Sequence, residues 1–559
     1  MGAELLKFAR QELLRPWTAP RKSDCPVGQS FEASFDQINL TVIVSGRVRG
    51  SKSGRGPTLT RAIEQAARKM LLDLRFGPPI TCAEMRDARI ELWIQTEQAR
   101  VFDLAEIDLG RDGVLLRLGS AEAYYKPSVA LTSAITEAQH LLEMLALKAG
   151  LEPDDWQDGD AEIFRTRWEH CTESSTDSEG ILILHRMRPV GDLKPVTREI
   201  ITNALLASAN RLVAVQQKEG FYLYECHAFN GRSKSGPGNL VRQAGCAYAI
   251  ANASGAFGDF NLVDRFRKSA ISAISFLLNA IELRWNDHAA VSHETDSNWL
   301  GLISLTLAAV QHRNIQQDFL EIRNRLRSDV LFSQRADGSL RCTATGNSLT
   351  DDGIKQDFYP GEALLALALE LNDGIENLDT PLEKAFEWYR KYFQMAPKSA
   401  LVAWHCAAWR LVCDYRRTIN GAREYADFVF EMVDWILEFQ LTPATNADSE
   451  YWGSFSPLGG KPSFSTAGYI EAIVHGYDLA VRDQLRERAS RYRDAAIRGF
   501  AFLLKLQICA GMKPILVSPS VSLGGTTKSL SDGTIRCDFD QHAITAYISA
   551  LQSPTFLGP

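Results

Sequence analysis

The chain has 559 residues, of which 45% are hydrophobic and 23% are charged, so it has enough apolar surface for more than one buried core. Its formal charge of −7 argues against nucleic-acid binding, which leaves a basic footprint, and no apolar run reaches the ~18 residues that a membrane span needs. We therefore expect a cytoplasmic globular protein of about two to four domains, with neither nucleic acid nor a membrane as its partner.

The first residues, MGAELLKFARQELLRPW, have the rhythm of an amphipathic helix and lack the basic flank and apolar stretch of a secretory signal. Ten cysteines are spread along the chain without a CxxC pair. A chain of this length does not need disulfide staples, so we expect reduced thiols.

Strand and helix patterns alternate from about Phe31 to Trp168. Strands are predicted at INLTVIVSG and ARIELWIQ, and a hairpin that turns near Gly119 at GVLLRLGSAEAYYKP. Helices are predicted at TLTRAIEQAARKMLLDL and ITEAQHLLEMLALKAG. The pattern predicts an α+β domain over residues 1–172.

A connecting segment is predicted at residues 173–196, where the composition changes to ESSTDSEG and then RPVGDLKPV. The two prolines of the second stretch fix φ and remove backbone donors. We expect this segment to run extended along a surface, with the two flanking domains docked against each other.

From residue 197 to the end, nearly every periodic segment is helical. Twelve helices are predicted, at residues 197–216, 239–254, 264–284, 296–312, 318–333, 361–372, 381–395, 399–416, 422–440, 463–483, 487–507 and 541–552. The even-numbered members are apolar nearly all round, whereas the odd-numbered members carry a charged face. This alternation predicts an inner ring of six buried helices inside six outer ones, an all-α (α/α)6 toroid over residues 197–559.

Long connections lead from the outer helices into the inner helices. The segments 217–238, 334–360, 441–462 and 508–540 each have roughly 20 to 30 residues, and the return connections are short. Long loops in a compact domain are usually functional. We therefore expect a site at the mouth of the toroid, where the N-termini of the inner helices meet.

Acidic and aromatic residues cluster at this mouth. We expect Asp357 and Asp540 to be a catalytic acid and base, with Tyr359 and His542 as proton carriers. Substrate-binding residues are predicted at Arg242, Gln243, Asp296, Asn298, Trp299, Glu362, Tyr469, Glu471 and Asp538. The structural alternative is that the aspartates cap helices and that Arg242 pairs with Glu362 inside the ring.

Two further patterns concern binding. The segment Gly46 to Gly54 is basic, and it is either a solvated turn or an anion-recognition edge with Arg49 as its central residue. Zinc would have soft ligands in Cys226 with His227, His405 with Cys406, and Cys537 with His542. None of these pairs has a recognised ligand spacing, so the prediction is that no metal or other cofactor is bound.

The N-terminal half resembles the AMMECR1 domain. The stretches LTVIVSGRVRGSKSGRGPTLTRAIEQAARKMLLDLRFGP, ARIELWIQ, DGVLLRLGSAEAYYKPSV, LLEMLALKAGLEPDDW and AEIFRTRW follow in the order of that family over roughly residues 10–170. The LRGCIG signature of the family aligns with VRGSKS, so Arg49 and Gly50 match, and Ser51 stands where the family has Cys. The resemblance implies an α+β fold and little about chemistry.

The C-terminal half resembles six-hairpin toroid enzymes: glycosidases, uronate lyases and glucuronyl C5-epimerases. The stretches RQAG and YPGEALLAL and the Asp-rich start of the last helix carry this resemblance. It implies an enzyme that binds a saccharide or another polar small molecule and acts by carboxylate acid–base chemistry. Two alternatives stay open: a cyclase or tailoring enzyme of small-molecule or peptide biosynthesis, with or without zinc, whose N-terminal domain docks a protein partner, and a non-catalytic scaffold.

Overall fold

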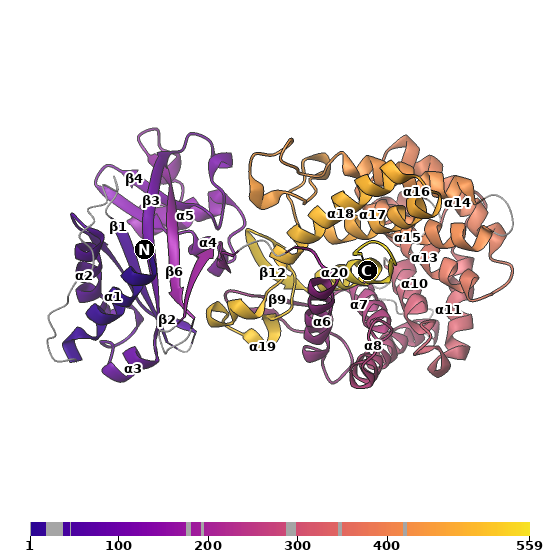
Figure 1. Cartoon of the computed structure of the whole chain (residues 1–559), viewed down its shortest axis with the longest axis horizontal. Helices are drawn as coiled ribbons and strands as arrows, with labels where there is room; N and C mark the ends of the chain where they lie inside the picture. The colour runs from indigo at the N-terminus through magenta and orange to yellow at the C-terminus, as the bar shows by residue number, and fades with distance from the viewer. Residues whose placement is uncertain are drawn as a thin grey trace.

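The computed structural model describes residues 2–17, 37–44, 46–174, 180–191, 195–286, 298–344, 349–417 and 422–558. The chain forms two domains that lie side by side, an N-terminal domain built around a sheet and a helical C-terminal domain (Figure 1). Within the described residues, none of the helices combines the length and the apolar character that crossing a membrane requires.

An antiparallel eight-stranded sheet forms the centre of the N-terminal domain, with strand order β2-β1-β3-β6-β4-β5 and with β7 and β8 added beside β6. The strands are β1 (Gln37–Val44), β2 (Arg47–Arg55), β3 (Arg89–Arg100), β4 (Gly113–Leu118), β5 (Ala121–Tyr125), β6 (Glu162–Glu173), β7 (Ile181–His185) and β8 (Arg188–Pro189). Sheet and helices are both present and all pairings are antiparallel, which confirms the predicted α+β class.

Two groups of helices cover the sheet. The helices are α1 (Gly2–Leu14), α2 (Leu59–Met70), α3 (Cys82–Asp87), α4 (Ser128–Thr132) and α5 (Ala138–Ala149). Alternate residues of β1, namely Ile38, Leu40 and Val42, are fully buried in one apolar cluster with residues of α1, α2 and α3. Helix α5 buries its apolar stripe against β4 and β5 in a second cluster. The first cluster therefore covers one face of the sheet at β1 and β3.

Two segments have more strand than their sequences indicate. Residues 46–54, interpreted as a basic turn or edge, lie largely in strand β2, where Ser51 pairs with Thr41 of β1. The connecting segment 173–196 contains β7 and β8, which extend the N-terminal sheet. In both cases the local sequence is rich in Gly, Ser and Pro and has a weak strand pattern. Pairing with a neighbouring strand satisfies its backbone N–H and C=O groups.

All twelve helices that the periodicity predicts are present in the described part of the C-terminal domain. They are α6 (Arg198–Ala214), α7 (Leu240–Ala253), α8 (Phe260–Asn286), α10 (Trp299–Val310), α11 (Leu320–Phe332), α13 (Tyr359–Asn372), α14 (Asp379–Met395), α15 (Ser399–Arg416), α16 (Arg423–Leu437), α17 (Thr466–Arg482), α18 (Arg486–Leu506) and α20 (Cys537–Gln552). Two four-residue helices, α12 (Leu349–Asp352) and α19 (Pro519–Ser522), lie in the long connections.

The inner ring closes. Helices α7, α10, α13, α15, α17 and α20 each contact the next, and α20 returns to α7, while each inner helix also packs against one outer helix. In α10 every residue from Leu300 to Val310 is buried, which is what an apolar surface all round requires. The predicted (α/α)6 toroid is therefore confirmed.

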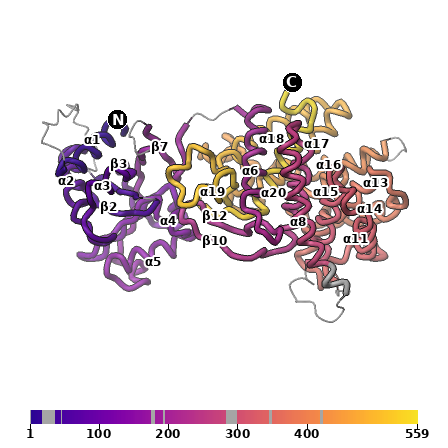
Figure 2. Tube along the Cα trace, turned by 90° about the horizontal axis from the view of Figure 1, so that it is seen from below, coloured from indigo at the N-terminus to yellow at the C-terminus, as the bar shows by residue number. Residues whose placement is uncertain are grey.

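Two of the long connections meet in a small antiparallel sheet. Its strands are β9 (Glu225–His227), β10 (Ser233–Lys234), β11 (Thr527–Ser529) and β12 (Asp532–Arg536), in the order β10-β9-β12-β11. In both views this sheet and α19 lie on the side of the toroid that faces the N-terminal domain (Figure 2). The connection from α6 and the connection from α18 thus form one surface beside the mouth.

An apolar cluster joins the two domains. Leu131, Leu184 and Met187 of the N-terminal domain pack in one cluster with residues of the toroid loops, among them Phe229 and Met512. Arg188 reaches across as well: its guanidinium donates to the backbone oxygen of Lys505 at 2.9 Å and to Oγ1 of Thr527 at 2.8 Å. These contacts show the docked arrangement that the rigid connection predicts.

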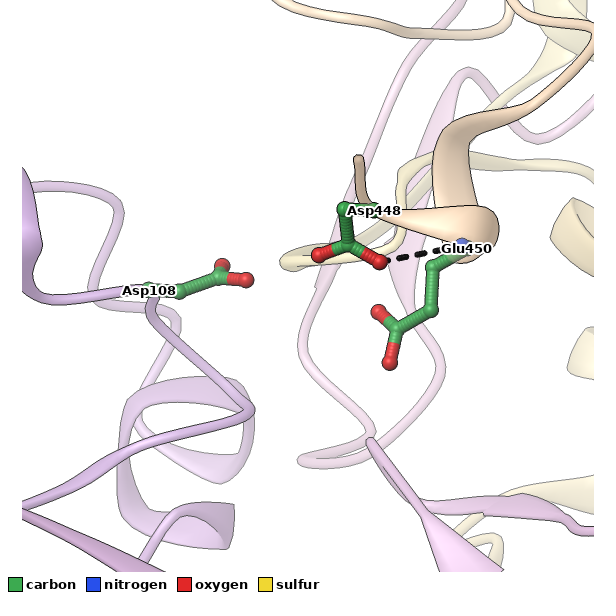
Figure 3. A group of neighbouring side chains, drawn as sticks. All are labelled: Asp108, Asp448 and Glu450. Atoms are coloured by element: carbon green, nitrogen blue, oxygen red, sulfur yellow. Dashed lines mark hydrogen bonds between the residues drawn. The ribbon is translucent and has the colours of Figure 1, made fainter. Parts of the chain in front are cut away.

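An ionic network lies beside the apolar cluster. Carboxylates of Asp108, from the N-terminal domain, and of Asp448 and Glu450, from the toroid, converge there (Figure 3). Arg186 pairs with both Asp108 and Glu450, and Arg111 pairs with Asp448. Each carboxylate therefore has a cationic partner, so we interpret the group as an interdomain ion-pair network and not as a metal site.

Replacing Glu450 by Gln is expected to weaken the docking of the two domains. Burial alone raises the pKa of Glu450, but His185 and Arg186 more than offset this and lower it to about 2, so the carboxylate stays charged and paired. Glu450→Gln leaves the buried Arg186 with one carboxylate fewer, at a cost of about 1–3 kcal/mol. Denaturant unfolding of the full chain measures this loss. The control Asp448→Asn, whose partner Arg111 is part-exposed, should cost less than ~1 kcal/mol; equal losses would contradict the assignment.

Candidate active site

A cavity of about 500 Å³ opens at the mouth of the toroid, among the N-terminal turns of the inner helices. All six inner helices contribute to its wall, together with residues just before α7, α13, α17 and α20. Its polar and aromatic lining residues include Arg242, Tyr359, Glu362, Trp404, Phe464, Tyr469, Arg536, Asp538 and His542. The cavity therefore lies where the long connections predict a site.

Glu362 is the buried acid of this cavity. It lies in the first turn of α13, is 6% exposed, and its Oε2 has no hydrogen-bond partner among the described residues. Burial raises the pKa of Glu362 to about 8, because the charged form would lose its hydration without a compensating partner. At neutral pH this residue is a protonated carboxylic acid that faces the cavity.

The absence of a side chain at Gly301 leaves room for Glu362 in the closely packed ring. A Cβ atom added to Gly301 of α10 would lie 2.7 Å from Oε2 of Glu362 and 2.7 Å from Cδ1 of Tyr359. Both distances are shorter than van der Waals contact, so only glycine at position 301 admits the observed side chains. Tyr359 is held from the same side, since its hydroxyl donates to Oδ1 of Asn298 at 2.7 Å.

Two arginines hold the second carboxylate. Arg536, at the end of β12, donates to both oxygens of Asp538, at 2.6 and 2.8 Å. Arg242 of α7 lies 3.3 Å from Oδ2 of Asp538 and donates its Nη1 to the hydroxyl of Tyr224. The anticipated pairing of Arg242 with Glu362 is thus not present, because Arg242 is committed to Asp538.

His542 provides a neutral imidazole at the same wall. Burial lowers the pKa of His542 below its usual value, although the carboxylate of Asp538 acts in the opposite direction. Its ring lies between Trp404, with centroids 5.7 Å apart, and Phe464, with centroids 6.4 Å apart. A proton acceptor is therefore present beside aromatic surface.

The structure brings six of the predicted site residues to the cavity: Arg242, Tyr359, Glu362, Tyr469, Asp538 and His542. Asp540, two residues from Asp538, is fully buried elsewhere: it pairs with Arg211 of α6 and accepts the backbone N–H of Thr526 at 2.6 Å. These bonds tie α20 to α6 and to the preceding loop, so Asp540 has a structural position outside the lining.

Other predicted residues surround the cavity without lining it. Asp357 accepts a hydrogen bond from the hydroxyl of Tyr392 at 2.8 Å. Gln243 donates to the backbone oxygens of Tyr222 and Pro237 and so holds the loop before α7. Glu471 accepts from Thr545 at 2.9 Å, and burial raises its pKa to about 7.

Three more predicted residues have other positions. Trp299 is half-buried at the start of α10 and packs against the toroid core. Asp296 lies outside the described residues. Arg49 remains within the N-terminal domain, where Nε donates to Glu84 at 2.8 Å and the guanidinium also reaches the backbone oxygen of Pro78. Arg49 therefore does not reach the cavity.

Sequence reasoning missed two contributors to the site, Arg536 and Phe464. Arg536 is the last residue of the short strand β12, where an arginine is usually a surface residue. Phe464 comes from the loop before α17, and its ring reaches His542 only when α17 and α20 pack together. The alternation of aspartates with an arginine in RCDFD was the available signal for the Arg536–Asp538 pair.

Among the described residues, only Asp108, Asp448 and Glu450 form a group of three with metal-ligand geometry. The Cys and His pairs considered for zinc do not gather with a third ligand there: Cys226 lies against Arg211, and Cys246 donates its thiol to the backbone oxygen of Cys537. The zinc-dependent alternative therefore has no geometric support within these residues.

A second cavity, of about 530 Å³, lies near the opposite ends of α15, α17 and α20. Two of its arginines are paired with the same carboxylate: Arg410 with Asp414 at 3.1 Å and Arg482 with Asp414 at 3.0 Å. Glu362 at the mouth has no such partner within the described residues. The mouth cavity is therefore the better candidate for chemistry.

Comparison with known proteins assigns the family of the N-terminal domain. The AMMECR1 family model matches residues 49–171, so this part of the chain is an AMMECR1 domain. The protein MK0488 of Methanopyrus kandleri is 30% identical over 114 residues, which are 19% of this chain and 55% of that protein. The protein MJ0810 of Methanocaldococcus jannaschii is 34% identical over 114 residues, 19% of this chain and 56% of that protein. The chain thus spans about half the length of these curated relatives.

Among solved structures, the uncharacterized protein PH0010 of Pyrococcus horikoshii is similar to the N-terminal domain, at 22% identity over 33% of this chain and 96% of that chain, with a TM-score of 0.29. The toroid is similar to cellobiose 2-epimerase of Bacillus thermoamylovorans (12% identity, 63% of this chain, 98% of that chain, TM-score 0.42). It is also similar to unsaturated glucuronyl hydrolase of Streptococcus agalactiae (11% identity, 64% of this chain, 92% of that chain, TM-score 0.43). The assignment of the toroid itself rests on its closed ring of helix contacts.

Proposed function

We propose that the toroid is an enzyme that binds a carbohydrate-like substrate in the mouth cavity and acts on it by proton transfer. The observation that carries the proposal is Glu362, a buried carboxylic acid without a hydrogen-bond partner for Oε2 among the described residues, in the wall of a cavity of about 500 Å³. A carboxyl group whose pKa is near the working pH is suited to general acid catalysis.

The other wall residues fit this role. The neutral ring of His542 accepts a proton, while Glu362 donates one to an oxygen of the substrate. Tyr469 and Trp404 offer flat apolar surface to the faces of a sugar ring, and Arg242 and Arg536 offer donors to its oxygens. Acid and base are then different residues, because burial raises the pKa of Glu362 to about 8 and lowers the pKa of His542 below its usual value.

The test compares Glu362→Gln with Asp357→Asn. Glu362→Gln keeps the shape of the side chain and removes the proton, so conversion of the substrate should fall at least ~100-fold. Asp357→Asn changes the same segment outside the cavity and should keep turnover within about threefold, since it removes no proton donor from the cavity. NMR of a panel of uronates, disaccharides and oligosaccharides, incubated with each protein, detects the product.

Two outcomes would contradict the proposal. Full conversion by Glu362→Gln would place the proton donor on another residue. A wild-type protein that neither converts nor binds any saccharide of the panel would remove the substrate class. As a further check, wild-type turnover should decline above pH 8, where Glu362 loses its proton.

A further inference from the structure

One face of the N-terminal sheet carries a buried polar network. Register places Asn39 beside Trp93 and Thr41 beside Glu91, and Trp93 in turn beside His170 of β6. All five residues are at most 5% exposed. We call them the polar sheet face; the opposite face of β1 is the apolar cluster under α1 and α2. Buried polar groups in such number are costly unless they are satisfied or used.

Lys126, the residue after β5, extends its amine onto this face. Its Nζ donates to Oγ1 of Thr41 at 2.5 Å and to Oδ1 of Asn39 at 3.1 Å, and lies 5.2 Å from the centre of the Trp93 ring. Among the described residues, no carboxylate lies within ion-pair distance of this amine. The amine therefore has two neutral acceptors and retains a third bonding direction.

The network has unused donors and acceptors beside this amine. Within the described residues, Nε1 of Trp93 and Nδ1 of His170 lack hydrogen-bond partners, while Nε2 of His170 faces Oε2 of Glu91 at 3.6 Å. The rings of Trp93 and His170 stack with centroids 3.6 Å apart. At the rim, the hydroxyls of Ser53 and Tyr124 lie 2.6 Å apart, and these two residues and Lys126 are only half-buried. Lys126 and the two rim residues are thus partly accessible to solvent.

We propose that Lys126 is the nucleophilic amine of a second site, which takes a small aldehyde or ketone with an anionic substituent as an imine. The nitrogen of Lys126 attacks the carbonyl carbon, a C–N bond forms, and the C=O π bond opens to a carbinolamine. The oxygen then leaves as water with both protons of the amine, and the C=N bond remains. The step needs no oxidant or reductant.

Burial keeps a fraction of this amine neutral and therefore nucleophilic. Burial, with repulsion from Lys148 of α5, lowers the pKa of Lys126 to about 8, while Glu91 of β3 acts in the opposite direction. Arg89 on β3 pairs with Glu91 at 2.9 Å, and the imidazole of His170 on β6 and the hydroxyl of Tyr124 on β5 also belong to the network. At pH 7 about one amine in ten is then neutral, against fewer than about one in a thousand for an ordinary lysine.

The anionic substituent is inferred from Lys148. Its Nζ donates to the backbone oxygen of Tyr124 at 2.5 Å and lies over the rings of Tyr124 and Tyr125. It has no carboxylate partner among the described residues, and burial and the nearby Arg75 lower its pKa to about 8. An anion bound here would compensate two ammonium groups that the protein itself leaves without paired carboxylates.

Borohydride trapping on the full chain tests the proposal. The protein is incubated at pH 7 with pyridoxal phosphate, or with acetaldehyde as an uncharged probe, and reduced, and adducts are located by peptide mass spectrometry. We expect Lys126 to be modified at least ~10-fold faster than exposed Lys69 of the same domain, and pyridoxal phosphate to modify it more than acetaldehyde does. Adducts on exposed lysines without Lys126 would overturn the site, and equal modification by the two probes would overturn the anionic preference.

Two variants separate a reactive amine from a structural ammonium. Glu91→Gln removes the charge that holds the proton on Lys126 and should speed trapping at pH 7, whereas Lys148→Gln removes a repelling charge and should slow it. Lys126→Arg should lose the adduct, since guanidinium stays protonated. Trapping that is unchanged in both charge variants would overturn the proposal. The labelling of the wild-type protein tests the proposal independently of whether a variant folds.

Discussion

At pH 8 the Glu362→Gln variant is expected to be more stable than the wild-type protein, and at pH 4 the two should be equally stable. The folded-state pKa of Glu362 is about 8, above its ordinary value of 4.5, because burial disfavours the carboxylate. Between these two pH values the unfolded chain releases a proton that the folded chain keeps. The stability of the wild-type protein therefore falls as pH rises from 4.5 to 8, and the neutral amide of the variant removes this loss.

The expected gain at pH 8 is on the order of a few kcal/mol, from a pKa difference of 8 minus 4.5. Denaturant unfolding at pH 4, 6 and 8 measures it, with Glu387→Gln on the exposed face of α14 as a control that should change nothing. The sign of the stability change at pH 8 decides whether Glu362 is unpaired or is paired with Arg242. If Glu362 were paired with Arg242, removing its charge would destabilise the protein at pH 8, so a loss at that pH would contradict the observed geometry.

Asp540→Asn is expected to destabilise the fold by about 3–5 kcal/mol, because it leaves the buried guanidinium of Arg211 without its counter-ion. Arg211 also donates to the backbone oxygen of Val521 at 2.8 Å, so the same change loosens the loop between α18 and α20. Chemical unfolding followed by far-UV circular dichroism reports the loss for the whole toroid.

Asp538→Asn is the matched control for this prediction. It lies two residues away on α20, in the wall of the cavity, and its partners Arg536 and Arg242 are part-exposed. Water can compensate for their lost partner, so the stability should change by less than ~1 kcal/mol while substrate binding weakens. A larger stability loss for Asp538→Asn than for Asp540→Asn would contradict this assignment, since it would mean that Asp538 is the structural residue and Asp540 the site residue.

The helices of the toroid are local properties and could be predicted. Each inner helix is apolar all round and each outer helix carries one charged stripe, and these patterns extend over more than ten residues, so tertiary contacts do not have to be known. Strands β2, β7 and β8 were missed for the opposite reason. GRVRGSKSG and the segment around Arg188 have weak strand patterns of their own, and their conformation comes from pairing with β1 and β6.

By itself, the sequence determined that an α+β domain precedes a ring of twelve helices and that polar groups gather where the inner helices begin. Only the tertiary structure decided the partner of each charge. Asp538 and Asp540 are two residues apart, yet one turns to the cavity and Arg536 while the other pairs with Arg211, because successive positions on a helix point in different directions. Whether an acidic side chain is ion-paired in the core or is an unpaired proton donor depends on side chains hundreds of residues away in the sequence, and the periodicity of the sequence does not identify them.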